Sequence, residues 1–426
     1  MPGPWANRIL PVAAVATIAL LWRFPSYTLL LIPVLGVMLA STLLATSPRT
    51  RAGIMALILG IGIPVAGFEN SFLFELFIQI GIYAALALGL NIVVGMAGLL
   101  DLGYAAFFAI GAYTWAIFGS PQAAAFIEGV SFPLPGWPYF YIFAALAVLT
   151  AAAVGVLIGL PALRLRGDYL AIVTLGLGEV VRVLANNLDH PVNITNGPKG
   201  ISPVERPPVD WLLQFSEWIG HPISLSEAYA LFFYFLVLGV MGLIVLINHR
   251  LDRSRFGRAW VAIREDEIAA RSMGIPLLRT KVLAFATGAA FSGIVGAIFS
   301  AKQLFVSPES FTLLQSITIL AMVILGGMGS IQGAILGAAA VTLLNIEVLK
   351  TLSDGLNHLR QSGFVLDLGF WSYNFSNLSS QLEPAKYERM IFGIIIVLMM
   401  IFRPTGLIPE KRHKLEMESS RRRRAS

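Results

Sequence analysis

Residues 227–247 read EAYALFFYFLVLGVMGLIVLI, and the chain continues NHRLDRSRFGR through residue 258. The first run is almost wholly apolar, and a helix needs about 20 such residues to cross a bilayer. The second run is strongly basic, and Lys and Arg collect in the cytoplasmic loops of membrane proteins. Together the two runs predict a membrane-spanning helix that ends in the cytoplasm.

Runs of this kind recur along the whole chain of 426 residues. Hydrophobic residues make up 57% of it and charged residues 13%, against about 25% charged in a soluble domain. We therefore expect an all-α, polytopic integral membrane protein with about 8–12 transmembrane helices, some of them re-entrant or broken. The candidate spans are residues 9–22, 27–46, 52–67, 72–94, 97–118, 138–160, 169–186, 227–247, 282–301, 311–326, 331–349 and 390–402.

Basic residues fall on alternate connections between these spans. The basic connections contain Arg49 and Arg51, Arg164 and Arg166, the cations of residues 248–281, and those of the tail from Lys411 to Arg424. The long connections at 187–226 and 351–388 are poor in Lys and Arg. This alternation predicts that both termini lie in the cytoplasm. It also accounts for the net charge of +6 without nucleic acid, because most of these segments lack interleaved aromatics for base stacking.

Several kinds of chemistry are missing from the sequence. There is no cysteine, which excludes disulfides and thiolate metal sites. No G-x-x-x-x-G-K-[ST] stretch occurs, so the chain has no phosphate-binding P-loop. The five histidines show no metal-ligand spacing, and no Ser/His/Asp set is recognisable. We expect a transporter subunit that is not an enzyme and that binds no cofactor or metal itself.

The connection after the opening run predicts two short helices. Apolar residues recur at helical spacing over 256–270, and Gly274 stands where a helix would end. Small Ala269 and Ala270 beside Glu267 would allow a partner protein to approach closely. The alternative is a surface helix that is merely solvated.

Two glycine-rich stretches, Gly95-Met-Ala-Gly98 and Gly326-Gly-Met-Gly329, interrupt the spans. The second mimics part of a dinucleotide-binding fingerprint, but it lacks the preceding strand, so we interpret it as a tight turn. Paired interruptions in the two halves of a transporter often lie near its pathway. Close packing of small residues is the alternative.

Polar groups inside the spans are candidates for function, because they are costly there. Glu179 and Arg182 are i,i+3 neighbours on one helix face and can pair. We interpret them as a structural or gating pair rather than as a clamp for cargo. The other polar residues in the predicted spans are Asn91, Asp101, Gln315 and Glu347.

These residues resemble a known family. Glu267-Ile-Ala-Ala-Arg-Ser-Met-Gly274 resembles the E-A-A-x-x-x-G motif through which permeases of bacterial ABC importers dock on their ATPase. The Glu stands one residue further from the alanines, as it does in branched-chain amino-acid permeases. Further stretches that resemble this family are Leu90–Gly95 with Gly98, Leu102, Gly103 and Gly111–Tyr113; Leu165–Gly176 with Glu179; Asn196–Ile201; Gly257–Trp260 with Arg264–Glu267; Ser307–Phe311; Leu325–Ser330; and Arg403–Leu407.

The resemblance implies the M-type membrane subunit of a leucine, isoleucine and valine importer in the bacterial inner membrane. It implies an H-type permease partner, two ATPase subunits that bind ATP and Mg, and a periplasmic binding protein. Urea or short amides are the alternative cargo, and an ion-coupled secondary transporter is a further alternative. The expected parts are an extra N-terminal membrane segment at 1–71, a permease core at 72–409 with a cytoplasmic coupling segment at 248–281, and a basic tail at 410–426.

Two sets of site residues follow from the resemblance and the spans. The expected ATPase-coupling residues are Arg258, Glu265, Glu267, Ala269, Ala270 and Gly274. The expected residues of the translocation pathway are Asn91, Gly95, Gly98, Thr174, Glu179, Gln315, Gly326 and Gly327, with Thr174 and Gln315 as weak polar contacts.

Overall fold

The computed structural model describes residues 6–24, 30–44, 47–165, 167–362, 365–367, 372–374, 384–403 and 405–408. Most of them are helical, which confirms the all-α fold. Among them the only sheet is a small antiparallel pair, β1 (Val365–Asp367) and β2 (Ser372–Asn374), in which Val365 pairs with Asn374. The predicted basic tail at 410–426 lies outside the described residues.

Eight helical runs in this part of the chain are long and apolar enough to cross a membrane. They are Arg49–Glu69, Ser71–Met96, Gly136–Ala162, Tyr169–Asn187, Leu225–Arg253, Leu277–Gln303, Pro308–Gly326 and Ile331–His358. Shorter apolar helices cover Leu31–Ser41, Ala105–Phe118 and Met390–Phe402. The number agrees with the prediction of long spans mixed with broken ones. The predicted first span forms helix α1 (Ala6–Arg23), which is not among the eight.

The chain divides into two compact units. The first unit contains residues 1–80 and 339–404, and the second contains residues 81–338 and 405–426. Two of the three boundaries fall inside helices, α5 (Ser71–Leu90) and α15 (Ile331–Leu343), and the third follows residue 404. The packing therefore groups the first residues of the chain with a later segment, which is a different division from the expected parts at 1–71, 72–409 and 410–426.

The first unit is built from helices at both ends of its sequence. Its elements are α1, α2 (Leu31–Leu43), α3 (Pro48–Leu57), η2 (Ile58–Gly62), α4 (Ile63–Glu69), η7 (Leu344–Val348), α16 (Leu349–Gln361), β1, β2, η10 (Pro384–Tyr387) and α17 (Glu388–Phe402). Trp22 Nε1 donates to the Gly62 carbonyl at 2.9 Å, which joins α1 to η2. Lys350 lies over the ring of Phe72, 5.6 Å from its centre, and so joins α16 to the start of α5.

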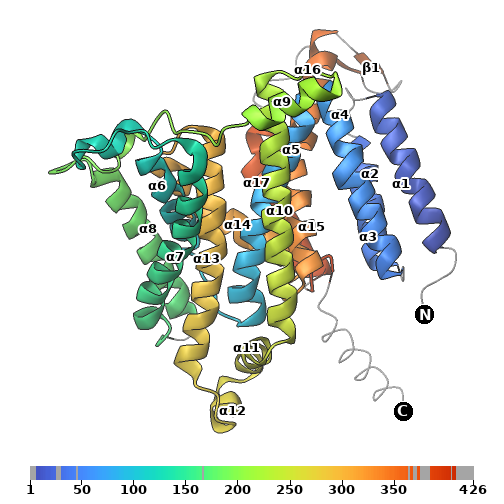
Figure 1. Ribbon diagram of the computed structural model, residues 1–426. Helices are drawn as coiled ribbons and strands as arrows, with labels where there is room; N and C mark the ends of the chain where they lie inside the picture. Colours follow the sequence, from blue (N-terminus) through green and yellow to red (C-terminus); the bar gives the residue numbers. More distant parts are fainter. Residues whose placement is uncertain are drawn as a thin grey trace, which may run out of the picture. The chain divides into compact units, whose positions relative to one another are not determined.

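The second unit is organised around α13 (Leu277–Gln303), with α6 (Ala105–Phe118) and α7 (Gly136–Ala162) packed along it (Figure 1). Small residues let these helices approach closely. A Cβ at Gly293 would lie 2.3 Å from the Ala147 carbonyl oxygen of α7, and one at Gly111 of α6 would lie 2.1 Å from the Gly293 oxygen. Neither contact has room for a side chain.

Both glycine-rich stretches break a helix, as predicted. After α5 the chain forms the π-helical turn η3 (Asn91–Met96) and reaches positive φ at Gly98 before α6 begins. Helix α14 (Leu313–Gly326) ends at a turn in which Gly327 has φ +119° and Gly329 has φ +80°. Such φ values are costly for residues other than glycine. Helix α6 starts beside the middle of α13. Tyr104, the residue just before α6, donates from Oη to the Gly288 carbonyl of α13 at 3.1 Å. It therefore runs along only part of α13.

The remaining elements of the second unit show what lies at each of its two ends. They are η4 (Pro121–Ala125), α8 (Asp168–Asn187), η5 (Gly197–Lys199), α9 (Asp210–Ile219), α10 (Leu225–Arg253), α11 (Arg255–Glu265), α12 (Glu267–Ser272) and η6 (Pro308–Phe311). Helices α11 and α12 lie where α10 ends and α13 begins (Figure 1). The loops around η5 and η6 meet at the opposite end, where Ile201 and Val306 form an antiparallel bridge.

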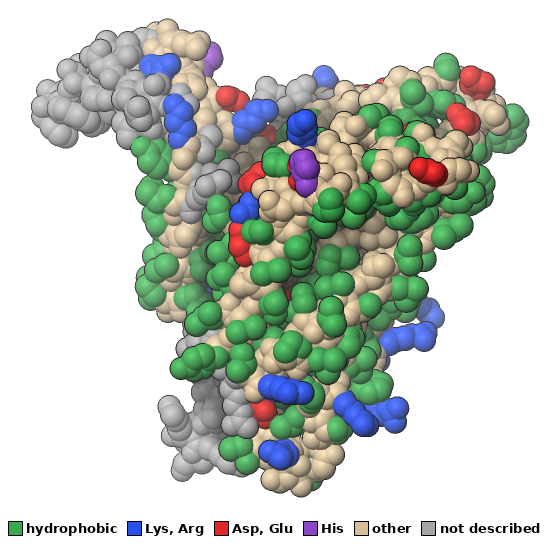
Figure 2. Space-filling model, turned by 90° about the vertical axis from the view of Figure 1, so that its left-hand side faces the viewer, with side chains coloured by type: hydrophobic (Ala, Val, Ile, Leu, Met, Phe, Trp, Pro, Cys, Tyr) green, Lys and Arg blue, Asp and Glu red, His purple; other side chains and the backbone are tan. Residues whose placement is uncertain are grey.

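Charge differs between these two ends. Figure 2 shows a broad band of hydrophobic side chains above a lower end where Lys and Arg gather. At the end of the unit that contains α11 and α12, the exposed arginines include Arg164, Arg250, Arg253, Arg255, Arg258, Arg271 and Arg279. The two basic connections of this unit that were predicted to be cytoplasmic, at Arg164 and at 248–281, thus share one end of the unit, as the positive-inside rule requires.

Candidate functional site

Helices α11 and α12 are defined by caps that their own sequence supplies. Ser254 Oγ accepts hydrogen bonds from the Phe256 and Gly257 amides at 3.1 and 3.3 Å and so starts α11. Asp266 Oδ1 accepts from the Ile268 and Ala269 amides at 2.8 and 3.0 Å and starts α12. These side chains satisfy amides that a helix start leaves unpaired.

Gly274, which has φ +83°, follows α12. The Gly274 amide donates to the Arg271 carbonyl and the Ile275 amide to the Ala270 carbonyl, which closes the helix end. The predicted pair of short helices ending near Gly274 is confirmed.

One side of this helix pair is attached firmly to α13. Trp260 is fully buried, and its Nε1 donates to the Thr280 carbonyl at 2.8 Å. Lys281 is buried and pairs with Glu267 Oε2 at 2.9 Å. Ala270 is 4% exposed and therefore packs within the chain. These contacts join both helices to the start of α13.

The other side of the pair faces solvent. Ile268 is 70% exposed and Met273 is 84% exposed on α12, with Ala269 exposed between them. Large apolar side chains gathered at a water-facing end often mark a site for a protein partner. Of the predicted coupling residues, those exposed to solvent are Arg258, Glu265, Ala269 and Gly274. Glu267 is held by Lys281, and Ala270 has its side chain on the inner face.

Arg264 links α11 to the first of the two breaks in the spans, and Asn91 links that break to the second. Its Nη1 donates to the carbonyl of Gly95 in η3, and a Cβ at Gly98 would lie 2.7 Å from Arg264 Cγ. Beside Gly95, the side chain of Asn91 accepts a hydrogen bond from the Gly329 amide at 2.8 Å. A continuous set of contacts therefore runs from the exposed helix pair to the two glycine turns.

The sequence-based site prediction did not include Arg264. The sequence spacing could have pointed to Arg264, because this residue lies four positions after Trp260 and therefore on the same face of α11. That face is the buried one, so an arginine on it needs a partner inside the protein.

A narrow crevice lies between the starts of α6 and α14 and the middle of α8. Its lining is mostly small or apolar, with Ser316 and Glu179 among the polar members. Ser316 Oγ accepts from the Ala105 amide at 2.9 Å and so ties the two helix starts together. The volume of about 10 Å³ is close to that of one water molecule. In this structure the crevice is too small for an amino acid.

The predicted pathway residues fall into three groups: one lines the crevice, five form the helix breaks, and two bond to other parts of the chain. Glu179 lines the crevice, whereas Asn91, Gly95, Gly98, Gly326 and Gly327 form the two breaks. Thr174 is 1% exposed, and its Oγ1 accepts from the Leu102 amide and donates to the Ala171 carbonyl, both at 3.1 Å. Gln315 donates to Tyr83 Oη at 3.2 Å. Both predicted polar contacts therefore already have partners within the chain.

Two other polar residues of the spans are buried. Asp101 is 1% exposed in the segment between η3 and α6, and its Oδ1 accepts from the Gly103 amide at 2.9 Å. Glu347, in η7 of the first unit, accepts from Thr351 Oγ1 at 3.3 Å.

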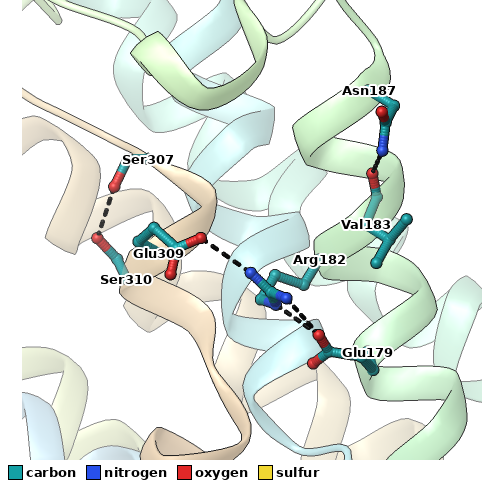
Figure 3. Close-up of polar contacts among 7 residues, drawn as sticks. All are labelled: Glu179, Arg182, Val183, Asn187, Ser307, Glu309 and Ser310. Atoms are coloured by element: carbon teal, nitrogen blue, oxygen red, sulfur yellow. Dashed lines mark hydrogen bonds and ion pairs between the residues drawn. The ribbon is translucent and has the colours of Figure 1, made fainter.

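A wider, open cleft of about 410 Å³ adjoins the crevice and shares Leu175, Glu179, Thr312 and Leu313 with it. We call it the charged cleft; its lining residues are Leu175, Glu179, Arg182, Glu309, Thr312, Leu313 and Leu314. Arg182 Nε donates to Glu179 Oε1 at 2.8 Å, and Nη1 donates to Glu309 Oε1 at 2.9 Å (Figure 3). Nη2 also donates to Glu179 Oε1. The predicted Glu179–Arg182 pair exists, and Glu309 is a third member that the sequence did not reveal as a site residue.

The described residues contain no group of three or more His, Asp or Glu side chains that could hold a metal ion.

Comparison with known proteins agrees with this architecture. Residues 72–400 match the family described as branched-chain amino acid transport system / permease component. The chain is 40% identical to the high-affinity branched-chain amino acid transport system permease protein LivM of Escherichia coli over 349 residues, which cover 79% of this chain and 70% of LivM. It is 26% identical to the probable LivM of Methanocaldococcus jannaschii over 351 residues, which cover 78% of this chain and 91% of that protein.

A second permease of E. coli is also similar. The chain is 22% identical to the high-affinity branched-chain amino acid transport system permease protein LivH over 326 residues, which cover 76% of this chain and 91% of LivH. No solved structure matches the chain. The family match covers most of the chain and includes both helix breaks, the charged cleft and the α11–α12 pair, so this protein belongs to the family of permease components of branched-chain amino acid transport systems.

Proposed function

We propose that this chain is the M-type permease of an importer that moves leucine, isoleucine and valine across a bacterial inner membrane by using ATP hydrolysed on partner subunits. Its similarity to both LivM and LivH of one organism supports a pair of related permeases, with an H-type subunit as the partner. The names of these relatives favour branched-chain amino acids over urea or short amides as cargo.

The exposed face of α12 is the proposed dock for an ATPase. It presents Ile268, Ala269 and Met273 at the basic end of the second unit, which is the end predicted to be cytoplasmic. The sequence of this chain has no P-loop, so ATP and Mg would bind to the two ATPase subunits instead. A periplasmic binding protein would deliver the cargo at the opposite end.

The contact between Arg264 and Gly95 is the observation that carries the proposal. It joins α11, the helix that precedes the proposed dock on α12, to a broken span, so that movement of α11 would change the backbone at Gly95. An ion-coupled transporter would not need an exposed apolar dock with such a connection. ATP-driven transport requires two conformations of the complex that differ in their affinity for ATP. The α11–α12 pair would transmit the change between them from the ATPase to the spans.

Reconstitution of the whole complex in liposomes tests the proposal. We expect ATP hydrolysis and uptake to be stimulated by the binding protein loaded with leucine, isoleucine or valine. Stimulation only by a urea-loaded or amide-loaded binding protein would contradict the cargo assignment. Uptake that follows an imposed ion gradient and ignores ATP would contradict the importer itself. The variant Ala269→Trp should abolish ATPase association, whereas Ala269→Ser, which adds little volume at the same exposed position, should keep it.

A further inference from the structure

The charged cleft combines side chains from two distant parts of the sequence. Glu179 and Arg182 belong to α8, and Glu309 belongs to η6, 127 positions after Arg182 (Figure 3). Glu179 and Arg182 lie in the later half of α8, and Glu309 lies in η6. Both elements border the loops around η5 and η6, at the end of the second unit opposite α11 and α12. In the proposed topology that end faces the periplasm, where cargo arrives.

The ion pairs of this cleft leave charge and hydrogen-bonding capacity unused. A guanidinium has five N–H donors; three of those on Arg182 donate to Glu179 and Glu309, which leaves two. Both carboxylates accept through Oε1 in these bonds, so neither Oε2 takes part in them. Two carboxylates around one guanidinium also give the cluster a formal charge of −1. The site can therefore still accept both an anion and a cation.

The remaining walls of the cleft are largely apolar. Leu175 of α8 and Leu313 and Leu314 of α14 line it beside the charged groups. It is an open groove rather than an enclosed pocket, and its volume of about 410 Å³ leaves room for one amino acid. Small-molecule sites likewise combine apolar walls with a few polar groups. An ion pair that only joined α8 to η6 would need a single carboxylate and no leucine wall.

In place of the structural or gating role expected from the sequence for Glu179 and Arg182, we propose that the charged cleft binds one aliphatic α-amino acid as it enters the permease. The two unused N–H groups of Arg182 take the α-carboxylate, because guanidinium suits planar two-oxygen acceptors. Glu309 and Glu179 take the α-ammonium, and the leucines face the aliphatic side chain. The proposal rests on the proposed function, because it takes the cargo to be an amino acid.

Ligand displacement tests this site in the assembled complex. The complex is placed in lipid nanodiscs without its binding protein, and bound radiolabelled L-leucine is displaced by leucine, by leucinol or by 4-methylpentanoate. Leucinol lacks the carboxylate, and 4-methylpentanoate lacks the ammonium. In the wild type, leucine should compete at least about tenfold better than either analogue, since the loss of one hydrogen bond to a charged group changes affinity by about this factor.

The variants then assign each ligand group to a side chain. Arg182→Gln should bring the leucine-to-leucinol ratio close to one, and Glu309→Gln should do the same for the leucine-to-4-methylpentanoate ratio. A purely structural role would weaken all three ligands equally and leave both ratios unchanged. Glu309 is 67% exposed, so its replacement should not impair folding. Glu217→Gln, on the exposed surface of α9, is the matched control and should behave as the wild type does.

Two outcomes would overturn the site. One is the absence of leucine binding to the wild-type complex up to about 10 mM, a concentration that would detect even weak sites. The other is identical ligand ratios in the wild type and all variants. Uptake from the leucine-loaded binding protein, measured on the same complex in liposomes, separates the two proposals. Normal uptake with unchanged ratios refutes the cleft alone, whereas no uptake by the wild type refutes the importer.

Discussion

Replacing Arg264 with methionine should uncouple uptake from ATP hydrolysis. The arginine donates from Nη1 to the Gly95 carbonyl, and its aliphatic stem packs against Gly98. Methionine keeps an unbranched stem of similar size but removes the charged donor. The change therefore breaks the contact between α11 and η3 while preserving most of the packing.

The size of the effect follows from this hydrogen bond. A bond from a charged donor contributes about 1.5–3 kcal/mol. If it forms in only one of two transport conformations, its loss shifts their equilibrium by roughly 10- to 100-fold, at 1.4 kcal/mol for each factor of ten. The contact of Arg264 with Glu265, at 3.2 Å, adds little because the Glu265 side chain is 66% exposed.

Uptake and ATP hydrolysis should be measured in the same liposomes, with the leucine-loaded binding protein present. We expect Arg264→Met to reduce uptake at least about tenfold while basal ATP hydrolysis continues. Arg255→Met is the matched control, because it removes the same charge from the exposed start of α11, where the guanidinium lies over the Phe256 ring. Equal losses of uptake and hydrolysis, or no loss of either, would refute the role of Arg264 in transmission.

Three further predictions follow from the described contacts. Ala269→Trp should leave the complex's membrane insertion intact but prevent co-purification of the ATPase, since packed interfaces tolerate added volume poorly, at about 1–3 kcal/mol; unchanged co-purification would show that the dock lies elsewhere. Single cysteines at Met273 and Ser202, both exposed, should differ in labelling by an impermeant outside reagent, with only the second reacting; outside labelling at Met273 would reverse the topology. Gly293→Ala should lower the melting temperature of the purified complex, because its Cβ would lie 2.3 Å from the Ala147 carbonyl oxygen; an unchanged melting temperature would contradict the close packing of α7 on α13.

The local chemistry of the sequence accounts for much of this protein. Apolar length and charge alternation predicted the helical spans and placed the basic connections at one end, because each property depends on neighbouring residues alone. The glycine turn at Gly327 and Gly329 and the helix end near Gly274 were predictable for the same reason: positive φ favours glycine. The Glu179–Arg182 pair followed from the i,i+3 spacing on a single helix.

The tertiary structure decided which residues face one another across helices. No spacing rule connects Arg264 to Gly95, or Arg182 to Glu309, since these pairs lie 169 and 127 positions apart. Burial likewise distinguished Ala269 from Ala270, which are adjacent and chemically identical but lie on different faces of α12. Thr174 and Gln315, predicted as polar contacts for cargo, were found to be bonded to other parts of the chain. Periodicity gives each helix its faces, but only packing determines what each face meets.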